Sequence, residues 1–306
     1  NWNMFSQNMA KNDIIQMKKI NLSPCTFIIP IRLESEDRIR NIITCLVYLL
    51  DNFKASYIIK EHDKTSVFSE VVLPQLEEYF GDDLKQIDIK HLFVQSDDPV
   101  FPRQRLINEM IDEMKTPIAV NYDCDVLIDR QGMKDGLSGI THWGGDISYP
   151  YGIGNFQRKV NATDELVTKF IENHFDFEVF YDHSEMSTAD FGWVQFIKKD
   201  QWVNLGMENE EFVAYAPEDK ERFWRFKKFN KRIYRGQSII YHLEHSRSPN
   251  SWFTNPHMKS NQELWEKLQV MNPHELLNYY RHRPYYEKYS CIQQIRKSGT
   301  TWQPNV

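Results

Sequence analysis

The first 125 residues of the chain alternate between short apolar runs and longer segments whose apolar residues recur at helical spacing. A run such as Cys25–Ile31 is typical of a buried parallel strand, because such strands carry little polar alternation. In Asp37–Phe53 the apolar residues return every three or four positions, which predicts an amphipathic helix. The same reasoning predicts strands at 57–59, 87–94 and 117–122, and helices at 66–80 and 103–114.

Strands that alternate with helices indicate an α/β protein with a doubly wound, mostly parallel sheet flanked by helices. Ligands of such sheets bind beyond the carboxyl ends of the strands. We therefore expect the functional site in the loops at 32–37, 61–65 and 123–125.

The second half of the chain is less regular. It predicts a smaller subregion followed by further helices, which begin near residue 263 and continue to residue 297. A stretch rich in Ser, Asn and Pro at 246–262 is typical of a loop that a ligand or a neighbouring segment orders. The other elements predicted here are helices at 161–174, 199–205 and 218–229 and strands at 191–197 and 232–241.

The composition excludes several classes of protein. Hydrophobic residues make up 41% and charged residues 26% of the 306, an ordinary globular mixture. The net charge of −6 argues against nucleic acid as the partner of the whole surface. The longest nearly apolar run, Ile42–Leu50, is shorter than the ~20 residues that a membrane-spanning helix needs. Four widely spaced cysteines without a CxxC pair fit a reducing compartment, so we expect a cytoplasmic protein.

One segment is strongly basic although the chain as a whole has a negative net charge. Lys220–Arg235 contains eight basic residues, one acidic residue and five aromatic residues. The interpretation that we favour is a half-buried helix with a solvated basic face. A nucleic-acid site and a surface that touches anionic lipid, which would make the protein peripheral to a membrane, are the alternatives.

Two carboxylates, Asp123 and Asp125, follow the predicted strand that ends near Tyr122. Carboxylate oxygens are hard ligands that suit Mg²⁺ or Mn²⁺ together with a diphosphate. A DxD triplet is weak evidence alone, but its position at a strand end strengthens the prediction of a metal site.

Two histidines, His242 and His245, follow the last predicted strand. Imidazoles at this spacing can complete a metal site begun by a carboxylate elsewhere, and a pair of surface histidines is the plain alternative. The segment is not HExxH, so it does not predict a zinc protease.

A third pair of chemical groups, Glu218 and Asp219, opens a predicted helix. Acidic residues are favoured at a helix N-terminus even without a function. The functional interpretation is that one of these carboxylates accepts a proton from an attacking hydroxyl.

These segments, taken in order, resemble the metal-dependent GT-A glycosyltransferases, above all the β-1,4-galactosyltransferases and the chondroitin-polymerase-type enzymes. Those families read roughly F-G-G-V, then G-F-x-N, then Trp-Gly-Gly-Glu-Asp, with a Pro-x-Arg loop, a Phe-Asn-Arg-x-x-Leu-x-Asn helix before the DxD strand and a late His-Ser-Arg. The matching segments here are 30–32, 101–108, 123–125, 191–194, 206–209, 215–219 and 242–247.

The chain departs from that pattern at positions that shape the sugar and acceptor pocket. Trp193 stands where the galactosyltransferases carry a second glycine, and Tyr215 stands for their tryptophan. Ala216 and Pro217 replace their two glycines, and His242 stands where those enzymes have methionine or another ligand. The resemblance therefore does not specify the donor sugar or the acceptor.

The polar residues 1–22 have no clear period and predict an arm or a peripheral helix, and the helical patterns after residue 262 predict an extension at 263–306. Between them the resemblance implies a nucleotide-sugar-binding half at 23–130 and an acceptor-binding and metal-completing half at 131–262. It also implies roles for individual residues. The implied donor-binding residues are Pro30, Arg32, Glu61, Asp63, Arg105 and Asp123. The implied metal ligands are Asp125, His245 and His242, and the implied acceptor-binding residues are Trp193, Tyr215 and Gly192. Asp219 is the implied catalytic base, with Glu218 binding the acceptor.

The function that follows is an inverting glycosyltransferase that moves a hexose or hexosamine from a UDP-sugar to a saccharide or glycoconjugate hydroxyl, with Mn²⁺ or Mg²⁺ as cofactor. Two alternatives use a similar sheet. A sugar-nucleotide nucleotidyltransferase usually has a glycine-rich phosphate loop after its first strand, and Arg32–Asp37 contains no glycine. A non-catalytic glycan-binding protein would lose metal or base residues, and this sequence keeps them.

Overall fold

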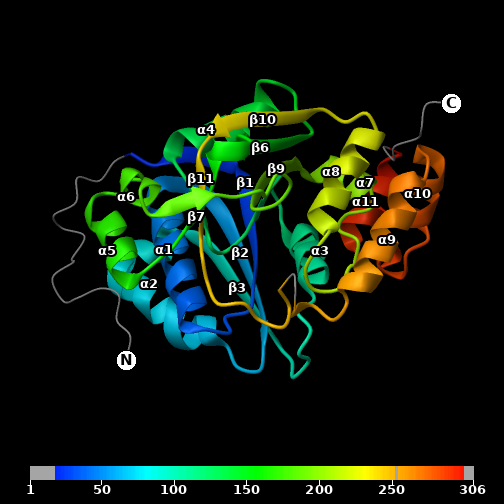
Figure 1. Cartoon of the computed structure of the whole chain (residues 1–306). Helices are drawn as coiled ribbons and strands as arrows, with labels where there is room; N and C mark the ends of the chain where they lie inside the picture. The colour runs from blue at the N-terminus through cyan, green and yellow to red at the C-terminus, as the bar shows by residue number, and fades with distance from the viewer. Residues whose placement is uncertain (1–17, 252–253, 300–306) are drawn as a thin grey trace.

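The computed structural model describes residues 18–251 and 254–299 (Figure 1). The predicted N-terminal arm therefore lies mostly outside the described residues. Its last part does not: the first strand begins at Ile20, so residues 20–22 belong to the sheet and the boundary predicted at residue 22 is wrong.

A seven-stranded sheet forms the centre of the molecule, with the strand order β10-β6-β9-β4-β1-β2-β3. Neighbouring strands are parallel except where β9 pairs with β4 and β6. This sheet confirms the predicted α/β class. Its strands are β1 (Ile20–Ile31), β2 (Phe53–Asp63), β3 (Asp88–Gln95), β4 (Ile118–Tyr122), β6 (Ile147–Tyr151), β9 (Val194–Lys198) and β10 (Ile233–Ser238).

A smaller, four-stranded sheet has the order β5-β11-β7-β8. In it β11 runs antiparallel to β5 and parallel to β7. The sequence predicted one strand over 232–241, but the chain changes sheets there, because β10 ends at Ser238 and β11 starts at Ile240. The strands are β5 (Val126–Ile128), β7 (Gln157–Val160), β8 (Ser184–Met186) and β11 (Ile240–Leu243).

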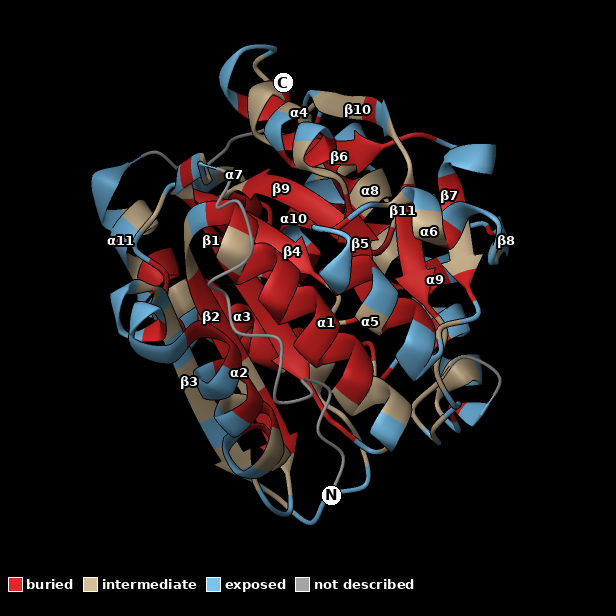
Figure 2. Ribbon diagram, turned by 90° about the vertical axis from the view of Figure 1, so that its left-hand side faces the viewer, coloured by how far each residue is buried: buried red, intermediate tan, exposed pale blue. Residues whose placement is uncertain are grey.

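Helix α1 (Glu36–Asn52) is more deeply buried than its amphipathic pattern predicts (Figure 2). Its polar side chains bond to the small sheet. The Asn41 amide donates to the Leu243 carbonyl at 2.8 Å, and the Tyr48 hydroxyl donates to the Ile128 carbonyl at 2.8 Å. Because buried polar groups need partners, these bonds fix β5 and β11 on the helix.

The other helices are α2 (Leu73–Phe80), α3 (Arg103–Glu113), α4 (Arg130–Thr141), α5 (Asp164–Glu172), α6 (Glu178–Tyr181), α7 (Lys199–Asn204), α8 (Glu218–Lys228), α9 (Met258–Val270), α10 (Pro273–Arg281) and α11 (Ser290–Ser298). The first part of the predicted helix at 66–80 is a π-helical turn, Phe68–Val72, which continues into α2. The loop predicted at 246–262 is shorter in the structure, because α9 begins at Met258. Helices α9 to α11 share one continuous hydrophobic core with the sheet. No helix among the described residues is long and apolar enough to cross a membrane.

Helix α4 and strand β6 were not predicted, and glycine explains the omission of the helix. Glycine is unfavourable within helices, so the sequence argues against one here. In the structure α4 packs closely on its neighbours. A Cβ on Gly136 would lie 2.4 Å from the Phe196 ring, and one on Gly139 would lie 2.3 Å from the Ser148 hydroxyl. Close packing therefore outweighs the cost of glycine in this helix.

The basic run at 220–235 does not form a continuous basic surface. Arg222 and Arg225 of α8 are buried, and both form ion pairs with carboxylates, Arg222 with Glu208 and Arg225 with Glu221. This supports the half-buried helix that we favoured from the sequence.

Candidate active site

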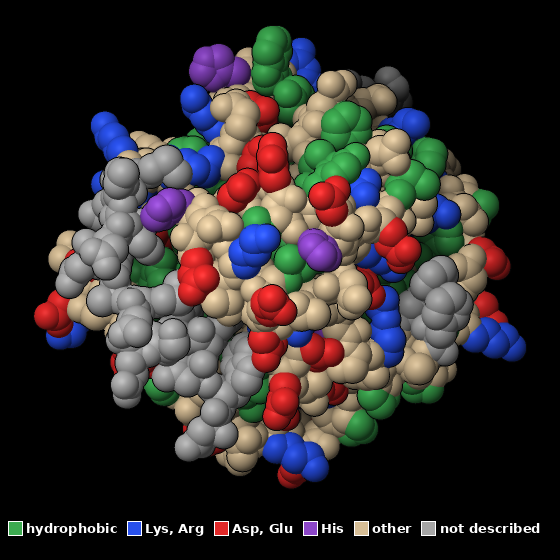
Figure 3. All heavy atoms as spheres, turned by 60° about the vertical axis from the view of Figure 1, so that its left-hand side comes forward, with side chains coloured by type: hydrophobic (Ala, Val, Ile, Leu, Met, Phe, Trp, Pro, Cys, Tyr) green, Lys and Arg blue, Asp and Glu red, His purple; other side chains and the backbone are tan. Residues whose placement is uncertain are grey.

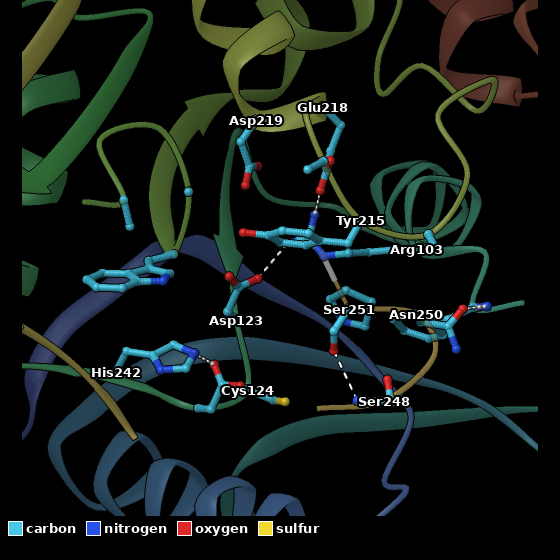
Figure 4. Close-up of a pocket in the computed structure, with 18 of the residues that line it drawn as sticks. Arg103, Asp123, Cys124, Tyr215, Glu218, Asp219, His242, Ser248, Asn250 and Ser251 are labelled. Atoms are coloured by element: carbon cyan, nitrogen blue, oxygen red, sulfur yellow. Dashed lines mark hydrogen bonds and ion pairs between the residues drawn. The ribbon is translucent and has the colours of Figure 1, made fainter. Parts of the chain in front are cut away.

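A pocket of about 380 Å³ lies where β1, β4 and β11 end and α3 and α8 begin. It brings together side chains from both halves of the chain (Figure 4). The predicted site residues that line it are Pro30, Arg32, Asp123, Asp125, Gly192, Trp193, Tyr215, Glu218, Asp219, His242 and His245.

Three of these residues form a cluster that can hold a metal ion. One ligand atom each from Asp125, His242 and His245 lies within 4.8 Å of the others. The His245 Nε2 is 3.1 Å from Asp125 Oδ2, and the His242 Nε2 is 3.5 Å from Asp125 Oδ1. Asp125 Oδ1 is buried and has no hydrogen-bond partner among the described residues. One carboxylate with two imidazoles suits a divalent ion such as Mn²⁺.

The surroundings of the two histidines direct their Nε2 atoms to Asp125. The other ring nitrogen of His245 lies 2.8 Å from the Ser246 carbonyl, and that of His242 lies 3.0 Å from Glu244 Oε1. Partners of this kind orient metal-binding imidazoles. Burial alone would raise the pKa of the Asp125 carboxyl, but the two histidines bring it well below its usual range.

Trp193 packs directly on this cluster. Its ring stacks on the His242 imidazole, with the ring centroids 5.5 Å apart and an interplanar angle of 21°. Its carbonyl accepts a hydrogen bond from the Asp123 N–H at 3.0 Å. The side chain is only 8% exposed. Trp193, an implied acceptor-binding residue, therefore has one ring face against a histidine. Tyr215, the other implied aromatic residue, is 45% exposed.

Arg103 connects the Asp123–Asp125 segment to the acidic pair at the start of α8. It lies between Asp123, whose Oδ1 is 2.5 Å from Nη2, and Glu218, whose Oε1 is 3.5 Å from Nη1 (Figure 4). Arg105, the residue that we predicted to contact a diphosphate, is absent from the pocket lining and lies near Glu109. The sequence did contain the signal, because Arg103 occupies the Arg position of the Phe-Asn-Arg motif that we matched to 101–108.

Glu218 and Asp219 are neighbours in the chain but have different surroundings. Glu218 is 2% exposed, and neither of its carboxyl oxygens has a hydrogen-bond partner among the described residues. Burial, together with the charge of Asp219, raises the pKa of Glu218 to about 8. Glu218 is therefore mostly protonated at neutral pH and can donate a hydrogen bond.

The Asp219 carboxylate forms an ion pair with Arg222, a fully buried residue of the same helix. Arg222 also donates to Glu208 at 2.7 Å and to the Gln195 side chain at 3.0 Å. The other Asp219 oxygen faces Gly192, where an added Cβ would lie 2.8 Å away. The buried guanidinium therefore fixes the orientation of the Asp219 carboxylate. Residue spacing does not predict that Arg222, Glu208 and Gln195 support Asp219, because these contacts arise only when the three side chains are buried together.

The structure does not bring Glu61, Asp63 or Arg105 into the pocket. Glu61 is fully buried, and its carboxylate accepts from the Ser66 hydroxyl and the Phe68 N–H and lies 3.0 Å from His91. Glu61 therefore lies outside this pocket, and its oxygens have partners within the fold.

Arg32 lines the pocket, but its guanidinium already donates most of its hydrogen bonds within the fold. Its guanidinium donates to the carbonyls of His62, Asp98 and Pro99 at 2.7–2.9 Å. Arg32 thus holds the loop that precedes α3 against β2 and forms part of the pocket wall.

No protein-family model and no curated protein matches the sequence. Many solved structures are similar in fold, and two of them illustrate the likeness. GalNAc-T7, crystallised with UDP, GalNAc and Mn²⁺, aligns with a TM-score of 0.52 and 9% identity over 90% of this chain, and this chain spans 55% of that one. Residues 1–349 of S. aureus TarS, in complex with UDP-GlcNAc, align with a TM-score of 0.50 and 13% identity over 85% of this chain and 72% of that one. At such low sequence identities the likeness shows the fold alone. It confirms the α/β fold of GT-A type that we expected.

We expect replacement of Trp193 by Leu to weaken Mn²⁺ binding about tenfold or more, because His242 then loses the ring that orients it. Replacement by Phe should keep the affinity within about threefold, since it retains a stacked ring. Isothermal titration with Mn²⁺ measures both effects. Trp143→Leu, a change at a tryptophan that is 67% exposed, is the matched control. Equal affinity in Trp193→Leu and the control would contradict the positioning role.

We expect Glu218→Gln to stabilise the protein progressively as the pH rises from 5 to 8. The wild-type side chain loses its proton above pH 4.5 when unfolded but only near pH 8 when folded, so its ionisation favours the unfolded chain between these values. Glutamine has no such ionisation, and the difference in unfolding free energy should reach about 1–3 kcal/mol at pH 8. Urea denaturation at several pH values measures it, with the exposed Glu172→Gln as control. A difference that does not change with pH would show that Glu218 is ionised in the folded protein.

Proposed function

We propose that the protein is a metal-dependent glycosyltransferase that transfers a sugar from a UDP-sugar to a hydroxyl group of a saccharide or glycoconjugate. One observation carries the proposal. The same pocket contains three side chains that can ligate a metal ion and the Asp219 carboxylate, which a buried arginine holds. The fold likeness to GalNAc-T7 and to TarS, whose structures contain UDP and UDP-GlcNAc, supports this choice of donor.

Asp125, His242 and His245 would hold the metal ion. The donor set fits, since Asp125 Oδ1 is buried without a hydrogen-bond partner among the described residues and the histidine Nε2 atoms lie beside the carboxylate. When bound, a divalent ion supplies positive charge that stabilises the departing diphosphate. Mn²⁺ suits two imidazoles better than Mg²⁺ does, so we propose Mn²⁺ as the cofactor.

Asp219 would act as the catalytic base. The ion pair with Arg222 orients the carboxylate, and one of its oxygens remains available on the side of Gly192. An ionised, oriented carboxylate can accept the proton of the acceptor hydroxyl as that oxygen attacks the sugar. A single attack from the face opposite the leaving group inverts the anomeric configuration, and we propose this outcome.

Glu218 would bind the acceptor as a neutral acid. Its raised pKa leaves a proton that can be donated to a hydroxyl oxygen of the incoming sugar. Two adjacent carboxyl groups that differ in protonation can take different roles in one reaction. Tyr215, with its exposed ring at the pocket, offers an apolar surface for the acceptor.

The segment at 246–251 would help to exclude water from the reaction. Asn250 bridges it to the loop before α3, donating to the Pro99 carbonyl at 3.0 Å and accepting from the Phe101 N–H at 2.9 Å. At its other end Ser246 bonds to Asp37 through both its N–H and its hydroxyl. Exclusion of water matters because water competes with the acceptor for the activated donor.

The test is UDP release from a panel of UDP-sugars with Mn²⁺ or with EDTA. We expect Mn²⁺-dependent hydrolysis of at least one donor, and loss of metal binding and of hydrolysis in Asp125→Ala. Asp219→Asn should lower sugar transfer at least about 100-fold, because it removes the base. Its affinity for UDP with Mn²⁺ should stay within about threefold of the wild-type value.

Asp200→Asn, a change at an exposed aspartate, is the matched control and should leave both quantities unchanged. Absence of turnover together with absence of UDP binding in the presence of Mn²⁺ would overturn the proposal. Once a product is obtained, its anomeric configuration by NMR decides the stereochemistry, and retention would refute the single-displacement mechanism.

A further inference from the structure

A second hollow of about 410 Å³ opens on the side of the small sheet and shares no lining residue with the first pocket. It lies between α6, the end of β5 and the link from β10 to β11. Its lining residues are Asp129, Phe177, Glu178, Tyr181, Asp182, Ile239 and Tyr241.

Aromatic rings form one side of this hollow. The rings of Phe177 and Tyr241 lie 5.9 Å apart and nearly parallel, at 30°. Tyr181 at the rim is 48% exposed. The guanidinium of Arg158 sits 4.3 Å from the Tyr181 ring centroid, so this ring already interacts with one cation. Tyrosine faces attract ammonium and guanidinium groups through the quadrupole of the ring.

Tyr241 is the deeply buried polar residue in the lining of this hollow. The residue is 4% exposed, and the described part of the chain provides no hydrogen bond to its hydroxyl. A phenol hydroxyl can accept a hydrogen bond from a charged N–H. Because the fold neither encloses this hydroxyl nor bonds to it, it is available to a group that enters the hollow.

The charge of this side of the molecule is strongly negative. The segment 161–187, which includes α5, α6 and β8, contains seven acidic residues and one lysine, a difference equal to the net charge of the whole chain. Acidic side chains gather near the centre of the face shown in Figure 3. Within the hollow, Glu178 and Asp182 have no ion-pair partner among the described residues. The neighbouring cation, Arg158, is held by the hydroxyl and the carbonyl of Ser184 at 2.6 and 2.8 Å.

We propose that this hollow binds an organic cation, namely the ammonium or guanidinium group of a basic polypeptide segment. The aromatic rings would cover the alkyl stem and the charged head, while Glu178 and Asp182 supply the counter-charge. A polypeptide fits better than a small free cation because acidic side chains extend beyond the hollow over α5 and α6. Several positive charges on one chain can meet this wider surface. The site is independent of the proposed transferase activity.

The probe is a capped peptide with four Gly-Arg repeats, titrated by calorimetry into the full chain at 50 mM NaCl. Its counterpart with citrulline in place of arginine has the same shape without the charge and should not bind. We expect the double variant Glu178→Gln, Asp182→Asn to bind the arginine peptide at least about tenfold more weakly, and Tyr181→Ala about threefold more weakly. Thermal unfolding of each variant shows that it is folded.

Glu165→Gln removes a charge from the same acidic segment outside the hollow and should weaken binding less than twofold. Equal losses in this control and in the double variant would mean that only the overall charge attracts the peptide, and would overturn the site. Absence of peptide binding would also overturn it. Spermidine, titrated in parallel, tests the source of the cation: tight binding of spermidine without binding of the peptide would replace the polypeptide by a free polyamine.

Discussion

The pairing of β11 with β5 is the contact on which the rest of the site depends. Asp125 lies directly before β5, and the two histidines lie at the end of β11, far away in the sequence. The Leu243 N–H donates to the Asp125 carbonyl at 2.8 Å and closes this ladder, while α1 holds both strands from beneath. Since side chains alternate along a strand, β11 can direct His242 to the metal cluster and its neighbour Tyr241 to the opposite hollow. A slip of one residue would exchange these two faces and dissolve the cluster.

The second constraint is the balance of buried charge. Arg103 and Arg222 stand among four carboxyl groups, those of Asp123, Glu208, Glu218 and Asp219. Two guanidinium groups cannot neutralise four anions, and unpaired buried charge is costly. The imbalance falls on Glu218, which has the longer contact to arginine and keeps its proton to about pH 8. The raised pKa of Glu218 therefore arises from burial and geometry rather than from residue type.

Trp193 departs from the glycosyltransferase pattern, and this departure affects both the local backbone conformation and the packing on His242. Its backbone has a φ of 67°, a left-handed conformation that favours the glycine of the resembled families. A tryptophan here carries a conformational cost, and stacking on His242 together with burial can offset it. The ring lines the pocket beside the three potential metal ligands, where those families carry no side chain.

The sequence by itself determined the order of strands and helices in the first half, because hydrophobic periodicity directly reflects which faces are buried. It also identified Asp125, His242, His245, Glu218 and Asp219, since their residue types and positions at element ends limit the chemistry they can perform. Only the tertiary structure decided which polar residues have their partners away from the site, as Glu61 does, and which have them inside the pocket, as Arg103 does between Asp123 and Glu218. The same holds for α4, whose glycines argue against a helix until the close approach of Phe196 explains them. Partners of this kind come from distant parts of the chain, and no local pattern records them.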